Sequence, residues 1–287
     1  MFFKLQNNPI YRISGPDAKR YLQGRITQDI SKLEIGQGKA SLVLSPQGQI
    51  YGKFYVLIEK DDSFLIVSDP LSDSEKKERF ISELLKFKVA DQLSLEEQDL
   101  SLISFQGSGF IEEFKKLSGT DLPEEELSFV KVGDQFFIKN SRSQEGGFDL
   151  VCPVDNEPTE SFGSEEERTL LRVQAKIPEM GSELNEKIFA PDIPIDSLVS
   201  FSKGCYAGQE VVEMAIARGK PNRALTAFSS ASQEAHSQGE EIFSGDKKVG
   251  FITSSALKDS SCLSLGFLKT GSDTSSLRAG EVELSVL

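Results

Sequence analysis

The residues best suited to chemistry lie in one short run, Lys203-Gly204-Cys205-Tyr206-Ala207-Gly208-Gln209-Glu210. Glycines on both sides of the cysteine favour a backbone that turns sharply and approaches another group closely. Residues 209–217 can form a helix, which would place Cys205 just before a helix N-terminus. The helix dipole and the Lys203 ammonium would both favour the thiolate, the form that attacks electrophiles and binds iron. A structural turn with a buried, inert cysteine is the alternative interpretation.

The rest of the sequence offers no second reactive cluster. Cys152 and Cys262 lie in apolar, strand-like runs, where a thiol should be buried and slow to react. The three cysteines form no C-x-x-C pair, which argues against a zinc ribbon or a thioredoxin-type motif. The only histidine, His236, lies in a polar loop, so a catalytic triad or a two-histidine metal site cannot be assembled. We therefore predict no metal site.

Composition excludes several classes of protein. The 287 residues suggest two or three domains, and 45 Asp and Glu against 32 Lys and Arg give a net charge of −13. With no long basic run, such a surface repels phosphate backbones, so we expect no direct nucleic-acid partner. An odd number of cysteines indicates a reducing compartment, and no run reaches the ~20 apolar residues of a membrane span. We expect a cytoplasmic protein without a membrane partner.

The predicted elements alternate between helices and short strands. A capping box beginning at Ser72 and another at Ser164 each open a helix, and little regular structure fits residues 177–202. Strands are expected at residues 42–44, 50–58, 64–67, 100–105, 129–138 and 148–152. Five short strands after residue 222 suggest a small C-terminal β-barrel or sandwich. This order favours an α+β fold with antiparallel sheets over a Rossmann fold.

The run from Lys203 to Glu210 resembles the K-G-C-[FY]-x-G-Q-E motif of the YgfZ family, the folate-binding relatives of the glycine-cleavage T-protein. Residues 21–29, YLQGRITQD, are similar to the family's F-L-Q-G-Q-V-T-x-D. Residues 45–50 resemble its D-x-x-G-K turn, and residues 171–178, LRVQAKIP, resemble L-R-I-E-A-G-I-P. Arg218-Gly219 and Arg223 fit the R-G-x-x-x-R that follows the cysteine motif. The resemblance spans roughly residues 10–270.

The resemblance implies a GcvT-like ring of three domains with folate in the central channel. A discontinuous folate-binding domain would comprise residues 1–45 and 135–221. Residues 46–134 would form an inserted ferredoxin-like domain with antiparallel sheets and helices, and residues 222–287 a small β-barrel.

The resemblance also implies a function and its residues. Cys205 and Lys203 would be the functional groups, and tetrahydrofolate or a derivative the ligand. Further ligand contacts are expected from Tyr206, Gly208, Gln209, Glu210, Arg218 and Arg223. The family supports iron–sulfur enzymes, among them one that methylthiolates tRNA, in a folate-dependent way. We therefore expect an accessory protein for iron–sulfur cluster assembly or repair, with client enzymes as transient partners.

Some positions depart from the family pattern. Gln174-Ala175-Lys176 stands where the family has E-A-G, and the chain has no Trp to stack on folate. Transferases of the broader superfamily carry an acid–base Asp where this chain has Gly52-Lys53. Its loss argues against glycine-cleavage chemistry. Two alternatives stay open: a folate-dependent aminomethyl or one-carbon transferase, and a relic of the fold that binds partners only. Whether the chain is an enzyme is left undecided.

Overall fold

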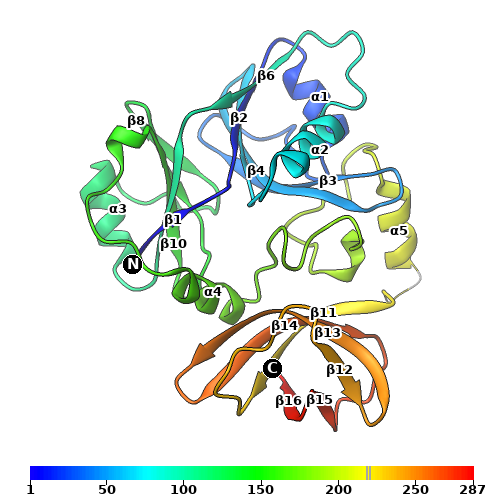
Figure 1. Cartoon of the computed structure of the whole chain (residues 1–287). Helices are drawn as coiled ribbons and strands as arrows, with labels where there is room; N and C mark the ends of the chain where they lie inside the picture. Colours follow the sequence, from blue (N-terminus) through cyan, green and yellow to red (C-terminus); the bar gives the residue numbers. More distant parts are fainter. Residues whose placement is uncertain (218, 220) are drawn as a thin grey trace.

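The computed structural model describes residues 1–217, 219 and 221–287, which form three bodies around a common centre (Figure 1). Two bodies are antiparallel sheets accompanied by helices, and the third is a closed β-barrel. The predicted α+β fold with antiparallel sheets and a C-terminal barrel is confirmed. Over the part of the chain that is described, no helix has the length and apolar character needed to cross a membrane.

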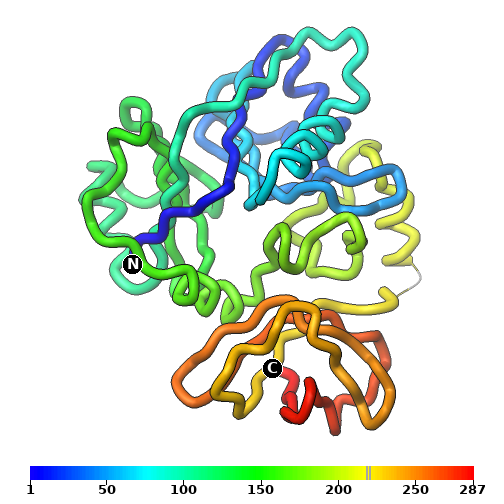
Figure 2. The backbone as a smooth tube through the Cα atoms, in the orientation of Figure 1, coloured from blue at the N-terminus to red at the C-terminus, as the bar shows by residue number. Residues whose placement is uncertain are grey.

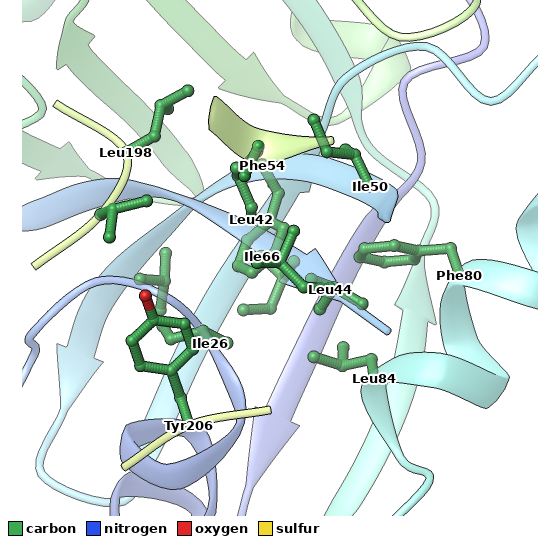
Figure 3. Close-up of a cluster of buried hydrophobic side chains, with 14 of the residues drawn as sticks. Ile26, Leu42, Leu44, Ile50, Phe54, Ile66, Phe80, Leu84, Leu198 and Tyr206 are labelled. Carbon is green, nitrogen blue, oxygen red and sulfur yellow. The ribbon is translucent and has the colours of Figure 1, made fainter. Parts of the chain in front are cut away.

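The first sheet contains the largest hydrophobic core. Its strand order is β3-β4-β5-β2-β6, with β2 Ile10–Ser14, β3 Gly38–Leu44, β4 Ile50–Lys60, β5 Ser63–Ser68 and β6 Ser94–Gln98. Helices α1 (Ala18–Arg25) and α2 (Ser74–Leu84) contribute Leu22, Phe80 and Leu84 to this core. Figure 3 shows Phe80 and Leu84 of α2 within it. These side chains recur at helical spacing, which is why the sequence predicts both helices.

One helix start differs from the prediction. The N-cap of α2 is Asp73, whose carboxylate accepts a hydrogen bond from the backbone N–H of Lys76 at 2.8 Å. The predicted capping box at Ser72 is therefore wrong by one residue. An aspartate at this position also interacts favourably with the helix dipole, which explains its preference over the serine.

The second sheet joins the first residues of the chain to its middle. Figure 2 shows the N-terminal segment lying along this body before the chain enters the first sheet. The order is β1-β7-β10-β9-β8, with β1 Phe2–Leu5, β7 Ser101–Gln106, β8 Phe129–Val132, β9 Gln135–Lys139 and β10 Gly147–Cys152. Helix α3 (Phe110–Ser118) packs Phe114 against Phe137 and Phe148 of this sheet.

The C-terminal residues form the barrel. Its strands are β11 Arg223–Ser230, β12 Glu241–Ser244, β13 Lys247–Lys258, β14 Ser261–Lys269, β15 Leu277–Ala279 and β16 Val282–Val286. Five of these were expected, and β15 was missed because it is only three residues long. Helix α4 (Glu165–Gln174), which begins at the predicted capping box on Ser164, packs Val173 against Ala227 and Leu265 of the barrel.

The strand pairing bears on the expected domain boundaries. The cut at 45/46 lies in the turn between β3 and β4, which pair within the first sheet. The cut at 134/135 lies in the hairpin between β8 and β9. Both cuts thus separate strands that share hydrogen bonds, whereas the cut at 221/222 lies just before β11.

An irregular segment connects α4 to the last helix. It contains a short 3-10 helix, η2 (Ala190–Asp192), and leads to α5 (Gln209–Ala217), the helix predicted after the cysteine motif. A second 3-10 helix, η1, spans Val154–Asn156. The long stretch without regular structure agrees with the prediction for residues 177–202.

Candidate functional site

The cysteine motif lies against the turn between β3 and β4. Gly208 has a φ of +87°, and a Cβ there would lie 2.6 Å from the carbonyl oxygen of Ser45. A Cβ at Gly48 would in turn lie 2.9 Å from a methyl carbon of Val211 in α5. Only glycine permits this approach without a shift. The structure therefore brings together two segments that the sequence analysis identified separately.

Lys203 is buried and directed at the backbone of another segment. Its Nζ donates hydrogen bonds to the carbonyl oxygens of Ile26 at 2.8 Å and Gln28 at 2.9 Å. Burial lowers the pKa of Lys203 to about 8, and the Asp29 carboxylate opposes that change. Within the described residues, no hydrogen bond joins Lys203 to Cys205. The expected support of a thiolate by this ammonium is thus not seen as a contact.

The three cysteines differ in exposure as predicted. Cys205 is exposed, whereas Cys152 and Cys262 are buried. Burial, and after it the charge of Glu157, raises the pKa of the Cys152 thiol to about 11. A buried thiol of that kind is inert, so Cys205 is the thiol available to a reagent or a partner.

The neighbours of Cys205 are mostly engaged with the protein itself. Tyr206 is buried in the core of the first sheet, close to Ile26 (Figure 3), and burial followed by the charge of Glu213 raises its pKa to about 12. The side chain of Gln209 accepts a hydrogen bond from the Tyr206 N–H at 3.2 Å and donates one to Glu213 at 2.7 Å. Glu210 is exposed. Tyr206 and Gln209 therefore fix the loop.

The two arginines expected near the ligand are placed differently. Arg218 lies outside the described residues. Arg223 donates to Asp192 at 2.8 Å and to the carbonyl oxygen of Lys187 at 2.7 Å, and its guanidinium lies 5.3 Å from the centre of the Phe267 ring. It lines a surface groove of about 470 Å³ between the barrel and residues 189–192.

A separate cavity of about 260 Å³ lies between the first sheet, the second body and the segment 176–198. It is lined by Ala40, Lys53, Phe54, Tyr55, Asp69, Leu127, Asn140, Ser141, Arg142, Lys176, Ile177, Pro178, Pro194, Ser197 and Leu198. Apolar walls with a few charged groups are typical of a pocket for a small organic ligand. None of the ligand contacts expected from the sequence is among these residues.

One ion pair in the cavity involves Lys53, in the Gly52-Lys53 pair where the resemblance leads us to expect an acid in transferases. Lys53 Nζ lies 3.1 Å from an Asp69 carboxylate oxygen and donates to the carbonyl oxygen of Pro178 at 2.8 Å. A Cβ at the preceding residue, Gly52, would collide with the ring of Phe80. Position 52 therefore cannot accept a larger side chain unless Phe80 moves.

A second charged group in the cavity wall is built around Asp149. Its carboxylate accepts hydrogen bonds from the Tyr55 hydroxyl at 2.9 Å, from Asn140 Nδ2 at 2.8 Å and from Arg142 Nη2 at 2.8 Å. Burial lowers the pKa of Arg142, but the charges of Asp149 and Tyr55, the hydrogen bond to Asp149 and the charge of Asp69 together raise it above its ordinary value. Asp149 is fully buried and thereby holds Tyr55, Asn140 and Arg142 in place at the cavity.

This cavity was not predicted from the sequence. Asp149 interrupts an apolar strand, Phe148–Cys152, and Lys53 interrupts another, so a charged residue inside an apolar strand was the available signal. Their partners lie in other strands and in loops, from Arg142, 7 positions from Asp149, to Tyr55, 94 positions from it, and pattern alone does not pair them. Over the residues that the structure describes, no group of three or more His, Cys, Asp and Glu side chains could hold a metal ion.

Comparisons with known proteins agree with this architecture. Residues 3–143 match the family of the GCVT N-terminal domain. An aminomethyltransferase of Koribacter versatilis is 25% identical over 266 residues, 85% of this chain and 69% of that protein. A tRNA-modifying protein YgfZ of Klebsiella pneumoniae is 27% identical over 252 residues, 80% of this chain and 72% of that protein. These identities are too low to show whether the chain shares the function of the aminomethyltransferases or that of the YgfZ proteins.

A solved structure extends the likeness to the whole fold. The crystal structure of glycine cleavage system aminomethyltransferase T from Bartonella henselae has a TM-score of 0.85 to this chain at 16% identity. The superposition covers 99% of this chain and 84% of that one. Residues 3–143 are therefore similar to the GCVT N-terminal domain family, and the chain has a GcvT-like fold over nearly its whole length.

Proposed function

We propose that this protein binds a reduced folate in the 260 Å³ cavity and acts as an accessory protein for iron–sulfur cluster assembly or repair. The observation that supports this proposal most directly is the place of Lys53. It lines the cavity where the transferases are expected to carry an acid. A lysine that is paired with Asp69 and Pro178 cannot accept the proton of a reacting amine. With lysine in place of the acid, we expect the protein to bind folate without catalysing aminomethyl transfer.

The cavity residues suit such a ligand. Phe54, Pro178 and Leu198 offer apolar surface to a flat ring, and Arg142 and Asn140 offer hydrogen-bond donors held by Asp149. A reduced folate, when bound, would supply a carrier for one-carbon units. The protein's own contribution would be to orient the ring and exclude water from it.

The exposed thiol supports the second half of the proposal. The motif around Cys205 resembles the one in proteins that maintain iron–sulfur enzymes, and several relatives are named tRNA-modifying protein YgfZ. An exposed cysteine on a loop fixed at both ends can meet a partner protein or a small electrophile. We expect client enzymes to be met at this surface, and no nucleic acid.

The test is a thermal shift with tetrahydrofolate, which should raise the melting temperature because it binds only the folded state. Ser197 lines the cavity, whereas its exposed neighbour Asp196 does not. Ser197→Trp should block the cavity and abolish the shift, and Asp196→Trp should retain it. A folded wild-type protein without a shift would count against folate. Equal shifts in the two variants would place the ligand elsewhere.

A second candidate function is folate-dependent aminomethyl transfer. Asp69 favours it, because this carboxylate lines the same cavity beside Lys53, and one set of relatives is named aminomethyltransferase. Turnover with the other glycine-cleavage components that disappears in Asp69→Asn would support the transferase. We expect no turnover.

A further inference from the structure

The buried ammonium of Lys203 is part of a larger connection between two segments. Lys203 is the first residue of the cysteine motif, and its Nζ donates hydrogen bonds to the carbonyl oxygens of Ile26 and Gln28. The segment just before it adds further hydrogen bonds: the Thr27 hydroxyl donates to the carbonyl oxygen of Leu198 at 2.6 Å, and the Ser200 N–H donates to the carbonyl oxygen of Thr27 at 3.0 Å. Lys203 is the charged member of this set.

A lysine is a costly residue in this role. Lys203 is 8% exposed and donates its hydrogen bonds to two neutral carbonyl groups. The Asp29 carboxylate acts on it through its charge alone, and Nζ lies 5.5 Å from the centre of the Tyr206 ring. Lysine is almost never buried in that way unless its charge is compensated, and apolar residues usually fill such sites better. We therefore expect Lys203 to have a role that an apolar side chain could not fulfil. Several donors on a long stem can join two carbonyl groups that no apolar residue could satisfy.

The loop that carries Cys205 is fixed at both ends and free in the middle. Lys203 anchors it on one side, while Tyr206 in the core and Gly208 against Ser45 anchor it on the other. Between the anchors, Cys205 is exposed and a Cβ on Gly204 would meet nothing within 4 Å. The thiol is thus held on a short, fixed arch at the surface.

We propose that Lys203 is a positioning residue for Cys205: its buried ammonium holds residues 203–208 against residues 26–28 and so fixes the thiol. Lys203 is not among the residues that line the 260 Å³ cavity, so it would not touch a ligand bound there. This inference rests on the proposed function only in giving Cys205 a role. Lys203 acts through the backbone of the loop.

The experiment compares Lys203→Met, Cys205→Ser and the double variant for restoring iron–sulfur enzyme activity to a deficient cell. If Lys203 acts through Cys205, each single variant loses activity and the double variant is no worse than Cys205→Ser. Amide exchange of Tyr206, whose N–H is bonded to Gln209 Oε1, and of Ser200, whose N–H is bonded to the Thr27 carbonyl oxygen, should rise about tenfold in Lys203→Met, the effect of losing one or two hydrogen bonds. Lys203→Arg should restore part of the protection.

Other measurements separate this role from ligand contact and from general instability. Lys203→Met should keep the tetrahydrofolate shift, and losing the shift in a folded variant would make Lys203 a ligand contact instead. Phe228→Ala, which opens the barrel core, should lower the melting temperature without changing exchange at Tyr206 and Ser200. If Lys203→Met fails to fold, Thr27→Val removes the bond to Leu198 and tests the same connection.

Two outcomes would overturn the positioning role. One is unchanged exchange at Tyr206 and Ser200 in Lys203→Met, and the other is a double variant clearly worse than Cys205→Ser. A wild-type protein that does not bind tetrahydrofolate would refute the proposed ligand, but the exchange measurement would still test Lys203.

Discussion

Burying the ammonium of Lys203 costs the folded chain free energy that depends on pH. Burial lowers the pKa of this group to about 8, against 10.5 for the unfolded residue. Below pH 8 both states are protonated and the full cost is present. Between pH 8 and 10.5 only the unfolded chain holds the proton, so stability rises with pH. The cost is gone once both states are neutral.

The stability of the wild type relative to Lys203→Met should therefore increase from neutral pH to above pH 10.5. The full change is at most about 3.5 kcal/mol, because each pKa unit corresponds to about 1.4 kcal/mol. Urea unfolding across this range measures it, with Lys32→Met, an exposed lysine, as the control. A difference that stays flat with pH would show that the ammonium is not buried in solution.

Lys176 illustrates what single residues reveal only in the structure. The resembling motif has glycine at this position, and Lys176 has a φ of +58°, a conformation that L side chains rarely adopt. The positive φ that favours glycine is thus retained at position 176 although the residue is a lysine. Lys176 lines the cavity and donates to the carbonyl oxygen of Leu287 at 3.1 Å, contacts that a glycine would lose.

At the scale of elements, the contact between α5 and the β3–β4 turn depends on Gly208. Alanine there would be strained by its φ of +87° and would also press a Cβ against the Ser45 carbonyl oxygen. Gly181 is a matched control, since its φ is +88° and a Cβ there would meet nothing within 4 Å. Gly181→Ala should cost about 1 kcal/mol, and Gly208→Ala more, up to about 3 kcal/mol.

Denaturant unfolding of the two alanine variants provides the measurement. The difference between them isolates the close approach, because both share the backbone strain. Gly208→Ala should also increase amide exchange in α5 and at Tyr206. Equal losses of stability in the two variants would mean that the turn and the motif are not in contact.

Sequence patterns located most elements because their signals are local. The capping box at Ser164 and the helix after Gly208 depend on neighbouring residues, and both are present. The strand Leu277–Ala279 is too short to carry a period-two pattern. Lys203 was expected beside a thiolate, yet its Nζ donates to the carbonyl oxygen of Ile26, 177 positions away. Such contacts follow from the packing of whole elements, which local spacing does not encode.

The same limit explains the cavity. Lys53 lies in β4, Asp69 directly follows β5, and Asp149 lies in β10 of the second sheet. Only the assembled fold places Lys53 and Asp69 in the cavity wall and Asp149 behind it. Their residue types indicated buried polar contacts, because charged residues in apolar strands need partners. The partners could not be named before the sheets were known.

At the scale of the whole molecule, a buried ionic network joins the barrel to the remainder of the chain. Arg172 of α4 lies 2.6 Å from a Glu183 carboxylate oxygen and donates to the Ser254 hydroxyl of β13 at 2.6 Å. Glu183 also accepts hydrogen bonds from Thr253 at 2.8 Å and Ser254 at 2.6 Å. Both charged groups are buried, so each depends on the other for compensation.

Removing one partner of this pair should loosen the barrel. Arg172→Met leaves the Glu183 carboxylate buried without its counter-charge, which typically costs about 3–5 kcal/mol. Arg172→Met with Glu183→Leu removes both charges and should recover part of that loss. Urea unfolding gives the free energies, and amide exchange of β13 reports whether the barrel separates first. A single variant that loses under about 1 kcal/mol, or a double variant less stable than the single, would mean that this network does not hold the barrel in place.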